Sequence, residues 1–172
     1  KDCNKILSIH DYLSFDGLRV IGLAYKKTNK ISEDNLIFIG MVAMMDIPRD
    51  EVKSSIEVLS GANIKTLMIT GDHRNTALSV ARQLNIATRD DEVISGVELD
   101  EMDEKQLIEN IERYKVFARV SPNNKLQIVS ALQSKNNIVA MTGDGVNDAP
   151  SLKKANSGIA MGINGTEVNK NA

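Results

Sequence analysis

The chain has 172 residues, enough for one well-packed domain with a small appendage. Its net charge of -2 gives no electrostatic basis for binding nucleic acid or an anionic membrane surface. The single cysteine, Cys3, excludes a disulfide framework within these residues, and no apolar run approaches the ~18 residues that span a bilayer. Because the chain begins on KDCNK and ends on VNKNA, we expect it to be a segment of a longer polypeptide.

The first third of the chain predicts two strands and a helix. The stretch 18–25 (LRVIGLAY) is typical of a strand, and the apolar run 36–45 is typical of a buried strand. The polar residues 26–35 between them are the best candidate for a domain boundary. Pro48 and the acidic residues after it predict a helix that ends at Gly61.

Predicted strands and helices alternate along the remaining sequence. Strands are expected at 64–69, 93–94, 116–120, 138–141 and 158–161. Helices are expected at 76–84, after a capping box at 103–106, after 121–122 and at 147–155. This alternation predicts an α/β fold with a Rossmann-like, mostly parallel sheet flanked by helices.

Three of the expected strands end in polar loops, at 70–72 (TGD), 119–121 (RVS) and 142–148 (TGDGVND). In open parallel sheets, ligands bind beyond the carboxyl ends of the strands. We therefore expect the three loops to converge. The segments that follow the two TGD tripeptides share no pattern, which argues against a tandem duplication.

The first loop has two interpretations. The hydroxyl of Thr70, the unhindered amide of Gly71 and a helix start beside Asp72 would form a cradle for an anion. Alternatively, the threonine and the aspartate simply cap the next helix. By itself the tripeptide favours the capping interpretation.

The third loop gives a more specific signal of a binding site than the first loop does. Two carboxylates, Asp144 and Asp148, flank Asn147 in a turn that also contains two glycines. Oxygen ligands of this kind suit Mg²⁺, which often bridges protein carboxylates and phosphate groups. An ordinary turn with capping aspartates is the alternative.

Cations stand near the expected strand ends. Lys125 lies in the first turn of a predicted helix, where the helix dipole disfavours a positive charge unless an anion is near. A solvated surface lysine is an equally good interpretation, and Arg119 would add a second cation. Arg19, His10 and His73 have no local pattern beyond surface or capping positions.

Taken together, TGDH (from Thr70), FARVSPNNK (117–125) and AMTGDGVNDAP (140–150) resemble P-type cation-transporting ATPases, which belong to the haloacid dehalogenase superfamily. The resemblance covers nearly the whole chain and is greatest to the calcium-transporting branch. It implies a haloacid dehalogenase-like fold. Residues 1–33 would be the C-terminal tail of the nucleotide-binding domain, and 34–172 would be the phosphorylation domain.

The resemblance also implies roles for individual residues. Those that would bind nucleotide or phosphate are Arg19, Thr70, Gly71, Asp72, Arg119, Lys125 and Asn147. Those that would hold Mg²⁺ are Asp144 and Asp148. Those that would act in catalysis are Lys125, Thr70, Asp144 and Asp148.

The parent implied by this resemblance is an ATP-driven, Mg²⁺-dependent cation pump that forms an aspartyl-phosphate intermediate. Calcium is the expected transported ion. The chain would be a cytoplasmic part of an integral protein of the bacterial plasma membrane, with the transported cation bound by membrane helices elsewhere in the polypeptide. ATP and the rest of that polypeptide are its expected partners, and nucleic acid is not.

Some family features differ or do not occur in these residues. The Asp-Lys-Thr-Gly-Thr motif that contains the phosphorylated aspartate does not occur in them, so we expect the chain alone to be inactive and its sheet to lack a middle strand. Ile47 replaces a hinge proline, and Asn156 stands where an aspartate is usual. A soluble Mg²⁺-dependent phosphatase of the superfamily and a non-catalytic phosphate-binding or Mg²⁺-binding module remain alternatives.

Overall fold

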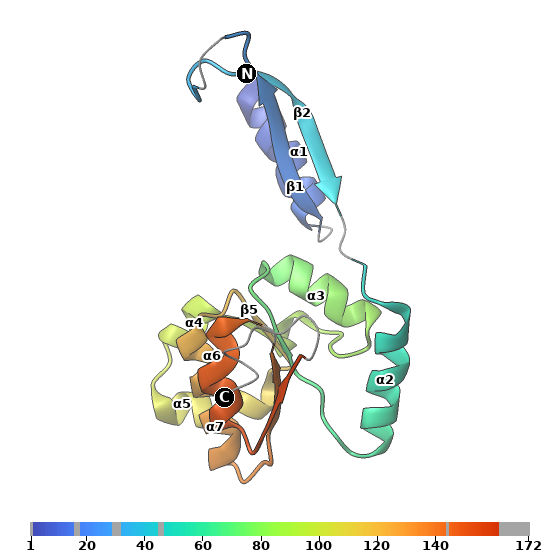
Figure 1. Ribbon diagram of the computed structural model, residues 1–172, viewed down its shortest axis with the longest axis vertical. Helices are drawn as coiled ribbons and strands as arrows, with labels where there is room; N and C mark the ends of the chain where they lie inside the picture. Colours follow the sequence, from blue (N-terminus) through green and yellow to red (C-terminus); the bar gives the residue numbers. More distant parts are fainter. Residues whose placement is uncertain (1, 16–17, 29–31, 45–46, 144, 162–172) are drawn as a thin grey trace.

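The computed structural model describes residues 2–15, 18–28, 32–44, 47–143 and 145–161 (Figure 1). The first elements, α1 (Asp2–Phe15), β1 (Arg19–Tyr25) and β2 (Ile37–Met44), project from one end of a larger α/β body. In the described part of the chain, no helix has both the length and the hydropathy needed to cross a membrane.

The projecting strands form an antiparallel hairpin, paired from Arg19 with Met44 to Tyr25 with Ile37. Both strands lie where the sequence predicts them, whereas helix α1 is not predicted. The expectation that the second strand is buried is wrong, because most of its residues are exposed and Ile39 retains 64% of its accessible surface. A two-stranded hairpin has too few neighbours to cover both of its faces, whatever the hydropathy of its sequence.

The body follows the predicted alternation of helices and strands. Its helices are α2 (Asp50–Gly61), α3 (Arg74–Gln83), α4 (Gly96–Asp100), α5 (Glu104–Asn110), α6 (Pro122–Ser134) and α7 (Ala149–Lys154). Its strands are β3 (Met68–Ile69), β4 (Val93–Ser95), β5 (Val116–Ala118), β6 (Ala140–Gly143) and β7 (Ser157–Ala160). Helix α4 is not predicted, and the expected strand at 64–69 is reduced to its last two residues.

Strand β5 organises the core. Val116 and Ala118 belong to a cluster with Ala77 and Ala81 of α3, whereas Phe117 belongs to another with Ile128 of α6. Successive side chains of a strand point to opposite faces of the sheet, so helices pack on both sides of β5. All three β5 residues are buried. This layered arrangement confirms the expected parallel sheet flanked by helices.

The parallel strands do not form one continuous ladder. Strand β5 lies between β3 and β4, while β6 pairs with β7. Within the described residues, β3 and β6 therefore each keep one edge without a ladder partner, and the two TGD loops end strands of separate ladders.

A buried carboxylate ties the loop before β4 to the start of β5. Glu92 is 5% exposed; it accepts backbone hydrogen bonds from Thr88 (2.8 Å) and Arg89 (2.9 Å), and Lys115 Nζ lies 2.6 Å from its Oε1. The Lys115 hydrogen bond, followed by those of Arg89 and Thr88, lowers the pKa of Glu92 from 4.5 to about 2. The charged form is thus favoured in the folded state.

We expect Glu92→Gln to destabilise the fold by about 2 kcal/mol at pH 7, allowing for solvent screening of the half-exposed Lys115. Because the folded pKa lies below the unfolded one, this stabilisation is present above pH 4.5 and disappears as the pH falls through about 2. Urea unfolding at several pH values should therefore show the variant and wild type converging in acid. Equal stability at pH 7 would contradict this, and the exposed Glu109→Gln is the matched control.

Candidate functional site

The first polar loop follows β3. Thr70 Oγ1 donates a hydrogen bond to Asp72 Oδ2 at 2.8 Å and accepts one from the Asp72 amide at 3.1 Å. The N-cap of α3 is His73, without a side-chain capping hydrogen bond, so neither Thr70 nor Asp72 caps that helix. The capping interpretation is therefore wrong. Gly71 is exposed, and a Cβ at this glycine would meet nothing within 4 Å.

The second loop lies directly against the first. The Thr70 amide donates to the Phe117 carbonyl at 2.9 Å, and the Arg119 amide donates to the Asp72 carbonyl at 3.0 Å. These bonds continue the β3–β5 pairing beyond the strand ends. They confirm that the first two loops converge.

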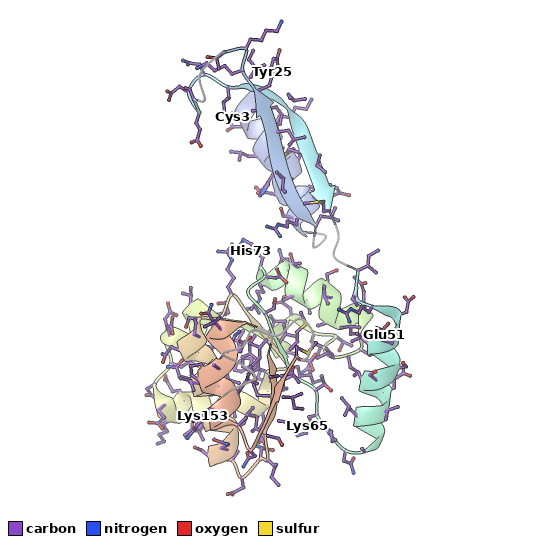
Figure 2. All side chains as sticks on the ribbon, in the orientation of Figure 1. Cys3, Tyr25, Glu51, Lys65, His73 and Lys153 are labelled. Carbon is purple, nitrogen blue, oxygen red and sulfur yellow. The ribbon has the colours of Figure 1, made fainter. Side chains whose placement is uncertain are left out.

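Arg119 adopts a left-handed backbone conformation, with φ of 48°. Its Nη2 lies 2.5 Å from Nε2 of His73, and because a guanidinium can only donate, the imidazole nitrogen accepts. Figure 2 shows His73 at the end of the body nearest the projecting hairpin. The two exposed side chains place a positive charge beside the Thr70 loop.

The third loop is joined to helix α6 by an ion pair. Lys125 Nζ donates to Asp148 Oδ1, and the two side chains are only 20% and 8% exposed. The interpretation of Lys125 as a solvated surface lysine is therefore wrong. The anion that offsets its unfavourable place in the first turn of a helix is a carboxylate of the protein itself.

Because Gly143 has no side chain, there is room for the Asp148 side chain at the end of β6. A Cβ at that glycine would lie 2.5 Å from the Cβ of Asp148 and 2.9 Å from its Oδ2. The same Oδ2 accepts a hydrogen bond from the Gly145 amide at 3.1 Å. Asn147 is exposed beside it, and Asp144 lies outside the described residues.

The carboxylate of Asp148, seated in the space above Gly143, suits Mg²⁺ as a hard oxygen donor. No group of three or more His, Cys, Asp or Glu side chains that could hold a metal ion occurs among the described residues. Mg²⁺ often keeps several waters and needs only one or two carboxylates together with phosphate oxygens. Asp148 therefore offers one donor of the kind that Mg²⁺ takes.

The structure brings the expected residues together in two linked groups. Main-chain hydrogen bonds join the first loop to the second, and helix α6, which starts in the second loop, is joined to the third by Lys125 and Asp148. Arg19 differs, because it begins β1 in the projecting hairpin, and none of the hydrogen bonds or ion pairs found among the described residues joins it to these loops.

Two residues at this site are given no role in the sequence analysis, although Asn124 lies within the motif at 117–125. Gly96 starts α4, and a Cβ there would lie 2.4 Å from the Arg119 carbonyl oxygen. Asn124 is 1% exposed and forms a capping box with Ser121. Its spacing three residues after a capping serine is the one pattern that could have drawn attention to it.

Comparison with known protein families matches residues 14–156 to haloacid dehalogenase-like hydrolases. The chain belongs to this family. It is 51% identical over 177 residues to calcium-transporting ATPase 1 of Bacillus cereus (99% of this chain, 20% of the relative). It is 42% identical over 168 residues to the calcium-transporting ATPase of Bacillus subtilis (94% of this chain, 19% of the relative). It is 44% identical over 169 residues to calcium-transporting ATPase 1 of Saccharomyces cerevisiae (93% of this chain, 18% of the relative). The chain spans about a fifth of the length of these curated relatives.

Proposed function

We propose that the chain is the phosphoryl-binding and Mg²⁺-binding part of an ATP-driven cation pump that works through an aspartyl-phosphate intermediate. Residues 1–33 would end a nucleotide-binding domain, and 34–172 would form most of a phosphorylation domain. The names of the similar proteins support calcium as the transported ion. The domain would face the cytoplasm, and the cation would bind in membrane helices elsewhere in the polypeptide.

The observation that carries this proposal is the Lys125–Asp148 pair at the end of β6. The largely buried lysine provides positive charge for phosphoryl oxygens. The carboxylate, which packs against Gly143, provides an oxygen ligand for a metal. Lys125 belongs to the helix that starts in the second loop, which main-chain hydrogen bonds join to the first, and loops with free amides and hydroxyls are typical of anion binding. Phosphoryl transfer depends mainly on such positioning and charge stabilisation.

Each residue of the site has a role in this proposal. Thr70 Oγ1 and the Gly71 amide would hold the transferred group, and Lys125, assisted by Asn147, would neutralise its oxygens. Asp72 would lie near the nucleotide phosphates. The residues that would contact ATP from either side of the domain boundary are Arg19 and Arg119. Bound Mg²⁺, held by Asp144 and Asp148, would supply further positive charge to the phosphoryl oxygens.

The nucleophile would come from the remainder of the polypeptide. An aspartate carboxylate there would form a bond to the γ-phosphorus while the bond to the ADP oxygen breaks, and water would later hydrolyse the acyl phosphate. The ladder edges of β3 and β6 that lack partners among the described residues are where a strand bearing it would add. The isolated chain should therefore not hydrolyse ATP.

We expect Asp144→Ala in the full-length protein to abolish Mg²⁺-dependent formation of an acid-stable phosphoenzyme from ATP. The measurement is acid-quenched labelling with γ-³²P-ATP over a Mg²⁺ titration. The exposed Asp11→Ala serves as the control. Normal phosphoenzyme levels in Asp144→Ala would show that the metal role is wrong.

If the upstream sequence contained no membrane helices and no large inserted domain, a soluble phosphatase would be favoured.

A further inference from the structure

One buried polar side chain beside the site takes no part in the proposed chemistry. Asn124 is 1% exposed, and it lies in the first turn of α6, immediately before Lys125. Burial of an amide is costly unless its hydrogen-bonding groups are satisfied, so such a residue is informative when it stands next to a functional one.

The side chain of Asn124 has a complete set of partners. Its Oδ1 accepts from the Ser121 amide and hydroxyl, both at 2.8 Å. Its Nδ2 donates to Asp100 Oδ1 at 2.7 Å and to Gln127 Oε1 at 3.1 Å. An amide offers two acceptor and two donor positions, and all four are used.

These bonds fix the start of α6 in two ways. The pair with Ser121 caps the helix, while the bond to Asp100, the last residue of α4, ties that first turn to a neighbouring element. Gly96, at the other end of α4, leaves room for the amide, because a Cβ there would lie 3.1 Å from Asn124 Oδ1. Helix α4 therefore holds the turn from which Lys125 extends.

Successive helical residues point about 100° apart, so Asn124 can face α4 while Lys125 reaches Asp148. We infer that Asn124 is a positioning residue for Lys125, acting through its buried hydrogen bonds to Ser121 and Asp100. This inference rests on the proposed function of Lys125. Misplacement of a charge by about 1 Å can cost on the order of 100-fold in rate, so the position of this turn matters for phosphoryl transfer.

The test exchanges the two partners in the full-length protein. Asn124→Asp would put a carboxylate opposite that of Asp100 and should lower the rate of phosphoenzyme formation at saturating ATP by roughly 10-fold, with the ATP KM within about 2-fold of wild type. Adding Asp100→Asn restores a donor and an acceptor with their roles exchanged, and should recover the rate to within about 3-fold. Asn123→Asp, the same change at the exposed neighbouring position, is the control.

Thermal unfolding, recorded for every variant, separates positioning from folding. A wild-type rate in Asn124→Asp, or a loss that follows the unfolded fraction and is not rescued by the exchange, would overturn the inference. If Asn124→Asp does not fold, Asp100→Ala removes one hydrogen bond from an exposed residue and should still lower the rate by about 3-fold; an unchanged rate would be equally contradictory.

Lys125→Ala, measured in parallel, distinguishes a failure of the positioning role of Asn124 from a failure of the proposed function of Lys125. Impaired Lys125→Ala beside unaffected Asn124→Asp would contradict only the positioning role. Normal phosphorylation of Lys125→Ala would contradict the proposed function of Lys125 and the inference with it.

Discussion

Replacing Lys125 with alanine should lower phosphoenzyme formation in the full-length protein by about 100- to 1,000-fold, the usual cost of removing one charge-stabilising donor from a preorganised site. Lys125 is largely buried and lies against Asp148 at the end of β6. Rapid-quench labelling with γ-³²P-ATP measures the effect. Because the charge is expected to act on the transferred group, the loss should fall on the rate at saturating ATP more than on KM.

Two controls make the Lys125 prediction specific. Lys135→Ala removes a lysine from the exposed C-terminal end of the same helix and should leave the rate within about 2-fold of wild type. Lys125→Ala also removes the Lys125–Asp148 ion pair, which should destabilise the domain by about 1–3 kcal/mol. A rate that falls only as far as the folded fraction falls would contradict a role in phosphoryl transfer.

Gly143→Ala is the second change with a large expected effect. The added Cβ would stand 2.5 Å from the Cβ of Asp148, far inside van der Waals contact, so the carboxylate must move. We expect a loss of stability of about 1–3 kcal/mol from overpacking and a loss of phosphorylation of at least about 10-fold. The affinity for Mg²⁺, read from the Mg²⁺ dependence of labelling, should fall in parallel.

The control for Gly143 is a glycine with room around it. A Cβ at Gly61 would meet nothing within 4 Å, so Gly61→Ala should leave phosphorylation unchanged. If Gly143→Ala labelled normally and kept its Mg²⁺ dependence, the position of the Asp148 carboxylate would not matter for the site.

The alternation of apolar strands and amphipathic helices was sufficient to predict the α/β body, because both periods are local properties of the sequence. Lys125 could be noticed because the first turn of a helix is unfavourable for a cation without an anion nearby, but a solvated surface lysine was an equally good interpretation of the sequence. Its partner Asp148 could not be assigned, because the two residues are 23 positions apart and meet only through tertiary packing. The roles of the site residues rest on the resemblance and stay predictions.

Burial was the least predictable property. The run 36–45 has the hydropathy of a buried strand, yet Ile39 and Phe38 are exposed. Hydropathy reports what a segment could bury, whereas exposure depends on what covers it. Strand β3 is also shorter than its hydropathy predicts, because only Met68 and Ile69 of the run 64–69 pair with β5.

Gly96 and Asn124 show a different limit. Gly96 belongs to no quoted motif, and although Asn124 lies within the 117–125 motif, nothing in that motif shows what lies opposite it: the Arg119 carbonyl for Gly96, and Asp100 for Asn124. Such requirements arise from close approach between elements. They are visible only once the elements are assembled.

The most direct test of the central claim is acid-quenched labelling of the full-length protein with γ-³²P-ATP and Mg²⁺, followed by hydroxylamine treatment. The account predicts a phosphoenzyme that is stable in acid, is cleaved by hydroxylamine as an acyl phosphate and forms only when the transported cation, first tested as calcium, is present. ATP hydrolysis without any such phosphoenzyme, or labelling of the isolated 172-residue chain by itself, would contradict it.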